Sequence, residues 1–249
     1  MISLLSKSSY LQIIERRDLG PLFKELELKQ SGAVLGASEP RFKGIDYLVM
    51  LDKNQNHYNC RIVKIDTGEI IVGWTGSIDD VAEKCVEKLE TEVALKSLKE
   101  LKNESGLRVT VNFMEDSYNV GDKIEFTVNS EDSDGYLYLI DIQPDGSVVV
   151  LLPNKHKVEF KVEEGEGILL PEKLGFSFKA TEPVGKDRLI AIVTKTPINI
   201  FKFGLKAGDI FTEVPGKSKG ALSRGMTVEL NQLPSADWGI TSAEIMIKK

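Results

Sequence analysis

Acidic residues recur between positions 130 and 141 with the spacing of a calcium-binding loop. Ser130, Asp132, Asp134, Gly135 and Asp141 correspond to the first, third, fifth, sixth and twelfth positions of such a loop. The loop requires Asp at its first position and a bidentate Glu at its twelfth, because carboxylate oxygens supply most of the Ca²⁺ ligands. Here those positions hold Ser and Asp, and the apolar run 136–142 predicts a strand where the loop would continue. We interpret the segment as an acidic turn and predict no metal site.

A histidine and a cysteine stand three residues apart at His57 and Cys60, and these residue types act as base and nucleophile in many enzymes. Successive side chains of a strand point to opposite faces, so this separation places the two groups on opposite faces of the predicted strand. His156 is the other histidine of the chain and could meet Cys60 only across the fold. We interpret Cys60 as a small buried hydrophobic residue and predict no catalytic Cys–His pair.

Gly216-Lys217-Ser218 has the composition that ends a phosphate-binding loop. The first glycine of that motif would fall at position 211, which is Phe, and no strand and helix are predicted on either side. We expect a surface turn there.

Trp74 and Trp238, each beside a glycine, are expected to be packing residues rather than ligand platforms. The sequence therefore predicts no catalytic residue and no cofactor.

The overall composition excludes several classes of partner. The 249 residues include 32 Lys and Arg against 38 Asp and Glu, a formal net charge of -6, so we expect no binding to nucleic acid. No apolar run is long enough to cross a bilayer, and the first ten residues do not have the pattern of a secretory leader, so we expect no direct membrane insertion. Two cysteines are too few for a disulfide-rich scaffold, and they do not assign a compartment.

One local excess of negative charge has two interpretations, a docking site or a solvated surface. Residues 115–145 hold nine acidic side chains and a single basic one, Lys123. The densest group is Glu131, Asp132 and Asp134, in a predicted turn between two strands. Turns carry binding functions more often than the strands they join, so this cluster is a candidate docking site. The alternative is that these charges only keep the surface soluble.

The first part of the chain alternates between the periodicities of strands and helices. A strand is predicted at 10–15, and a helix follows from Asp18 to about Gly32. Further strands are predicted at 45–51, 58–65 and 69–74, with a turn at 66–68 between the last two. A capping pattern at Ser77 begins an amphipathic helix that runs to about Leu101. We predict a small α/β domain over residues 1–105.

The remainder of the chain is dominated by short runs typical of strands. They lie at 107–113, 123–129, 136–142, 147–152, 175–180 and 188–194, with turn signals between them. This spacing is typical of a sandwich or barrel. We predict an all-β antiparallel sandwich domain over residues 106–249, and therefore an α+β protein with two domains.

The first domain resembles a known family in three stretches of sequence. Residues 11–32 (LQIIERRDLGPLFKELELKQSG), then 44–49 (GIDYLV) and 61–70 (RIVKIDTGEI), are similar to the curli-assembly lipoproteins and related TolB-like envelope domains. The resemblance covers about residues 5–90. The family's lipidated cysteine and membrane-spanning hairpins have no counterpart here, so pore formation is not implied. What the resemblance implies is an α/β interaction module.

The second domain resembles the bacterial domain of unknown function 4384. The matching residues are 120–124 (VGDKI), 134–139 (DGYLYL), Asp145-Gly146, 151–154 (LLPN), Leu170-Pro171 and 185–187 (GKD), within about 107–200. The family is found beside caspase-like peptidase domains and in envelope proteins. The resemblance implies a β-sandwich accessory module and transfers no catalytic residue.

Two classes of function are compatible with these resemblances. The favoured one is a non-catalytic binding or assembly module of a bacterial cell-envelope system, with a protein as its partner. The alternative is an accessory regulatory or targeting region of a caspase-like peptidase system, encoded without its catalytic domain.

Overall fold

The computed structural model describes residues 11, 45–54, 57–208 and 211–249. The strand expected at 10–15 and the helix expected at 18–32 lie outside these residues, apart from Leu11. The chain divides into two compact units, Met1–Glu90 and Thr91–Lys249. The sequence places a boundary near residue 105, whereas this division falls within helix α3 (Ile78–Glu100).

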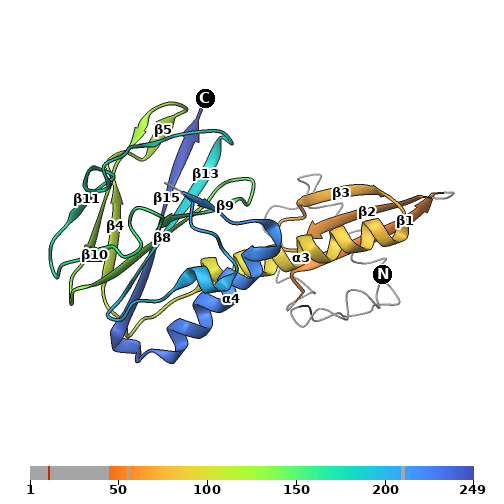
Figure 1. Ribbon diagram of the computed structural model, residues 1–249. Coiled ribbons are helices and arrows are strands. Elements are labelled where there is room, and N and C mark those ends of the chain that lie inside the picture. The colour runs from red at the N-terminus through yellow and green to blue at the C-terminus, as the bar shows by residue number, and fades with distance from the viewer. Residues whose placement is uncertain (1–10, 12–44, 55–56, 209–210) are drawn as a thin grey trace. The chain divides into compact units, whose positions relative to one another are not determined.

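The first unit contains a three-stranded antiparallel sheet in the order β1-β2-β3, with α3 beside it (Figure 1). Its strands are β1 (Tyr47–Asn54), β2 (His57–Lys64) and β3 (Ile70–Gly76), close to the predicted ranges. The predicted turn is present, because the Gly68 N–H donates to the Lys64 carbonyl. The predicted cap is also confirmed, since the Asp80 N–H donates to Ser77 Oγ over 3.2 Å.

The second unit contains one large sheet and two small ones. The large sheet has the order β14-β9-β8-β13-β15-β5, with β10 also paired to β8, and the small sheets are β11-β7-β4 and β12-β6. The strands of the large sheet are β5 (Ser117–Asn119), β8 (Gly135–Ile142), β9 (Val148–Leu152), β10 (Lys161–Val162), β13 (Gly185–Thr194), β14 (Thr212–Glu213) and β15 (Trp238–Lys248). Those of the small sheets are β4 (Val109–Phe113), β6 (Lys123–Ile124), β7 (Phe126–Ser130), β11 (Ile168–Leu170) and β12 (Phe178–Lys179).

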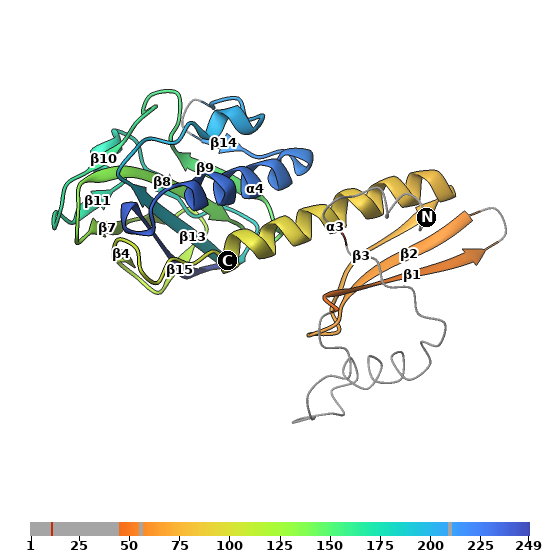
Figure 2. The same ribbon diagram turned by 90° about the horizontal axis from the view of Figure 1, so that it is seen from below.

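Both faces of the large sheet are buried. On one face, Leu139 of β8 and Ala191 of β13 pack with Val128 of β7, as expected of a sandwich. On the other face, Ile140 and Ile192 pack with helices, namely α4 (Gly216–Gln232) and the end of α3 (Figure 2). A strand buried on both faces needs apolar residues at consecutive positions, which explains the nearly continuous apolar sequence of β8.

The second domain is therefore not all-β, and the prediction of an all-β sandwich over 106–249 is wrong in this respect. The helix α4 buries Leu222, Met226 and Leu230, which recur every four residues and cover the large sheet. Its sequence also contains Gly220 and Gly225, which disfavour a helix in isolation. Burial of the apolar stripe outweighs that propensity, so the helix forms.

Two further expectations about this region are corrected. Gly216-Lys217-Ser218 is the first turn of α4 rather than a surface turn, and the short strand β14 precedes it. The sheet is not wholly antiparallel, because β15 runs parallel to β5 from Met246 to Lys248. Both tryptophans are packing residues as predicted: Trp74 packs on the core of the first unit, and Trp238 is 5% exposed in the core of the second.

Candidate functional site

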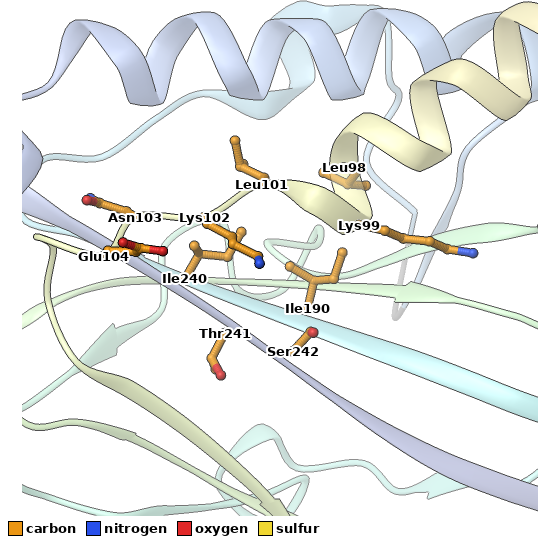
Figure 3. A pocket seen from close by; sticks show the side chains of 10 residues that line it. All are labelled: Leu98, Lys99, Leu101, Lys102, Asn103, Glu104, Ile190, Ile240, Thr241 and Ser242. Atoms are coloured by element: carbon orange, nitrogen blue, oxygen red, sulfur yellow. The ribbon is translucent and has the colours of Figure 1, made fainter. Parts of the chain in front are cut away.

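A pocket of about 380 Å³ opens in the second unit, between the end of α3 and the large sheet. This volume lies within the range of small-ligand sites. Leu98 and Leu101 lie on one side of the pocket and Ile190 and Ile240 on the other (Figure 3). Leu98 and Ile190 are almost fully buried, so the pocket has an apolar floor.

The segment that follows α3 forms one wall of the pocket and is anchored by Asn103. Its side-chain amide donates to the carbonyls of Ser235 and Trp238, each over 2.9 Å. The Leu107 N–H donates to the same Trp238 carbonyl over 3.0 Å. These bonds tie the wall to the beginning of β15, so the pocket is built on the sheet rather than on a loose loop.

The rim of the pocket is polar and includes a lysine that points into it. Figure 3 shows the Lys102 ammonium group among the side chains of the apolar walls. Lys102 is exposed and forms no ion pair with any residue that the structure describes. Ser242 of β15 adds a hydroxyl group, and Glu104 is the one carboxylate among the lining residues. The pocket therefore combines an apolar floor with a cation available to an anionic group.

The predicted acidic cluster lies at the turn between β7 and β8, and part of its charge is matched within the chain. Arg108, just before β4, donates from Nη2 to Asp132 Oδ1 over 2.7 Å, and its backbone N–H donates to Asp132 Oδ2 over 2.7 Å. The Arg108 guanidinium also lies 3.4 Å from Glu131 Oε2. The Arg108 side-chain hydrogen bonds hold the pKa of Asp132 below its usual range.

Asp134 has a different role in the same turn. Its Oδ1 accepts a hydrogen bond of 2.8 Å from the Glu164 N–H, which joins the turn to the segment that follows β10. The turn is closed by Ser130, whose hydroxyl donates to the Ser133 carbonyl. Asp141 lies at the far end of β8, about 20 Å along an extended strand from Asp134, so it does not join these acids around a common point.

The candidate catalytic residues are separated as the strand periodicity predicts. His57 is exposed at the start of β2, whereas Cys60 is fully buried and faces α3. His156 is exposed in a turn of the second unit, where its backbone N–H donates to Asn154 Oδ1. The structure thus does not bring His57 and Cys60 together.

Two carboxyl groups with raised pKa values lie in the large sheet, and sequence reasoning did not single them out as a pair. Burial raises the pKa of Asp141 to about 7, with a further contribution from the negative charge of Asp187. Burial also raises the pKa of Asp187 to about 6, assisted by the charge of Asp145. One oxygen of Asp187 is buried without a hydrogen-bond partner among the described residues. In the sequence, the signal that could have identified Asp141 is its position as the one charged residue in the otherwise apolar strand β8.

The described residues show neither a metal cluster nor a membrane-spanning helix. Within 45–54, 57–208 and 211–249, no group of three or more His, Cys, Asp or Glu side chains is placed to hold a metal ion. In the same part of the chain, no helix has the length and apolar character needed to span a membrane.

Residues 117–197 match the model of a protein family described as Domain of unknown function (DUF4384). The predicted resemblance of this region is therefore confirmed. Two glycines of the resembling motifs have clear structural reasons. A Cβ at Gly135 would lie 2.4 Å from Val193 Cγ1, and Gly146 turns between β8 and β9 with a φ of 82°. The resemblance of the first domain to the curli-assembly lipoproteins is not supported by these comparisons.

Comparison with solved structures finds the sporulation control protein Spo0M from Bacillus subtilis, with a TM-score of 0.28 and 10% sequence identity. The match covers 57% of this chain and 49% of the Spo0M chain, so it spans about half the length of that protein. A search of curated proteins finds no match.

Proposed function

We propose that this chain is a non-catalytic binding or assembly module of a bacterial cell-envelope system, and that its second unit holds a protein partner. The observation that carries the proposal is the pocket at the end of α3, with its apolar floor and the Lys102 ammonium group at its rim. The assignment to the envelope rests on the family resemblances rather than on this geometry.

The pocket chemistry specifies the part of the partner that binds. An ammonium group beside an apolar floor favours a carboxylate attached to an apolar group, because burying the apolar part drives association while the lysine pairs with the charge. In a protein partner this combination occurs where Asp, Glu or the terminal carboxylate adjoins Leu, Ile or Phe. We therefore propose that the partner inserts such a segment between Leu101 and Ile240.

Site-specific photo-crosslinking in cells that produce the protein tests this proposal. A photoreactive amino acid replaces Lys102, and a matched control replaces Lys206, which is exposed, lies outside the pocket and forms no ion pair with a described residue. We expect a discrete protein to be linked at position 102 and not at 206, and mass spectrometry identifies it. Equal crosslinking at both positions would contradict a binding role for the pocket.

The alternative proposal is an accessory region of a caspase-like peptidase system. Like the envelope proposal, it rests on what the family resemblance of residues 117–197 implies. The identity of the crosslinked protein separates the two: an envelope component favours the first proposal, and a peptidase chain favours the second.

A further inference from the structure

The two cysteines of this chain lie against each other in the core of the first unit. Cys60 is on β2 and Cys85 is on α3, and both side chains are 0% exposed. Both belong to the same buried core cluster, and their side chains are close enough that each shifts the pKa of the other: the pKa of Cys60 is lowered and that of Cys85 is raised. Each cysteine alone would count as a small apolar residue, but side-chain contact between the only two thiols provides both halves of a disulfide.

We propose that Cys60 and Cys85 form a disulfide that covalently joins β2 to α3 when the chain folds in the presence of a disulfide oxidant, such as oxidised glutathione or a thiol–disulfide exchange protein. The surroundings favour a structural bond. Ile62, Val81 and Leu89 belong to the same buried core cluster as the two cysteines, so a bond formed there would be shielded from reductants.

The chemistry balances as two successive exchanges. While the core is open, either thiol can ionise and begin the exchange, and a sequence that begins at Cys60 has the same balance as one that begins at Cys85. The Cys60 thiolate attacks the oxidant disulfide, forms a mixed disulfide and releases one thiolate. Cys85 then loses its proton, and its sulfur attacks the Cys60 sulfur and displaces the second thiolate. The oxidant is reduced to two thiols while the two cysteines are oxidised.

Burial determines when this exchange can occur. Because both sulfur atoms are inaccessible once β2 and α3 have packed, the oxidant reaches them while the first unit is folding or transiently open. Oxidation is therefore expected to be fast during refolding and slow in the folded protein. Once formed, the bond closes the segment between residues 60 and 85, and this restricts the unfolded chain.

The test uses the full chain, refolded from denaturant with and without a glutathione redox mixture. After refolding, the protein is denatured, labelled with iodoacetamide and analysed by mass spectrometry. We expect no label on the oxidised sample and two labels on the reduced one. Trypsin cleaves after Lys53, Arg61, Lys84 and Lys88, so the oxidised sample should give a linked pair of peptides, residues 54–61 and 85–88.

Cys60→Ala and Cys85→Ala are matched controls, because each keeps one of the two thiols. In both we expect one label after oxidative refolding and no linked peptide. The oxidised wild-type chain should unfold at a midpoint raised by roughly 5 °C or more relative to its reduced form, a difference that both variants should lack. Two labels on the wild-type chain after oxidative refolding, or peptides linked only between different chains, would overturn the proposal.

Discussion

Asp141 of β8 is paired with Leu189 of β13, and Asp187 lies two residues before Leu189 on that strand. The carboxyl groups of Asp141 and Asp187 therefore lie on adjacent central strands of the large sheet. Both side chains point to the same side of the large sheet as Leu139 and Ala191, the side that faces the small sheet β11-β7-β4. A charged carboxylate is costly in such surroundings. The protein therefore favours the protonated form of Asp141, whose pKa is raised to about 7.

The raised pKa of Asp141 predicts that the free energy of unfolding falls as the pH rises. The unfolded chain releases the Asp141 proton near pH 4, and the folded chain holds it until about pH 7. The contribution of protonated Asp141 to the free energy of unfolding is therefore complete below pH 4, and it is lost as the pH rises through the folded-state pKa of about 7. We expect a larger free energy of unfolding at pH 5 than at pH 8, by on the order of 1 to 3 kcal/mol, measured by urea denaturation.

Asp141→Asn isolates that contribution, because the amide has the shape of the carboxyl group but cannot ionise. The variant should be more stable than the wild type at pH 8 and should show a flatter pH profile. Asp116→Asn is the control, since Asp116 is exposed in the second unit. An unchanged pH profile in Asp141→Asn would show that this residue is not the titrating group.

Leu139→Ala tests the packing of the large sheet against the small sheet β11-β7-β4. Leu139 is 0% exposed, between β8 and the small sheet. Truncation should lower the free energy of unfolding by about 2 to 5 kcal/mol, since it removes buried methyl groups and leaves a cavity. Val158→Ala is the control and should change it by no more than about 0.5 kcal/mol, because Val158 is 64% exposed. An equal, small effect of both changes on urea denaturation would refute the core assignment.

In the second unit, the central strands of the large sheet could be predicted from the sequence, but the helix that covers it could not. Strands such as β8, β9 and β13 could be predicted because their apolar runs end at clear turns, for example Asp145-Gly146. The helix α4 could not, because its glycines resemble loop residues and only the packing of Leu222 and Met226 against the sheet stabilises it. Local propensity does not contain that tertiary contribution.

The candidate site was predicted less well than the fold. Glu131, Asp132 and Asp134 do lie together, because one turn contains all three. Their partner Arg108 is distant in sequence, and β4 pairing with β7 is what brings it to the turn. The pocket is lined by residues between 98 and 104, at the end of α3 and just after it, together with Ile190 of β13 and residues 240–242 of β15, which are distant in sequence. No local pattern marks such a site.

Neutralising the acidic cluster tests the docking prediction made from the sequence. A triple variant, Glu131→Gln with Asp132→Asn and Asp134→Asn, should weaken binding of the crosslinked partner and reduce the salt dependence of the binding that remains. The single change Asp132→Asn is the control for loss of the Arg108 pair, and circular dichroism checks the fold of both. Unchanged partner binding by a folded triple variant would assign the cluster to surface solubility and internal pairing.

A panel of peptidase and phosphatase substrates, assayed with and without a chelator, tests the non-catalytic part of the proposal. We expect no turnover by the purified chain under either condition. The separation of exposed His57 from buried Cys60 is the structural basis for this expectation. Turnover that disappears in Cys60→Ala or His57→Ala would contradict it.

The most direct test of the proposed function is the affinity of the crosslinked partner for three forms of the full chain: the wild type, Lys102→Glu and Lys206→Glu. Isothermal titration calorimetry with the purified partner measures each Kd. Reversal of the Lys102 charge replaces attraction for the partner's carboxylate by repulsion, so we expect Lys102→Glu to weaken binding by roughly tenfold or more. Lys206→Glu should bind like the wild type. Equal affinities for all three forms would contradict binding through the pocket.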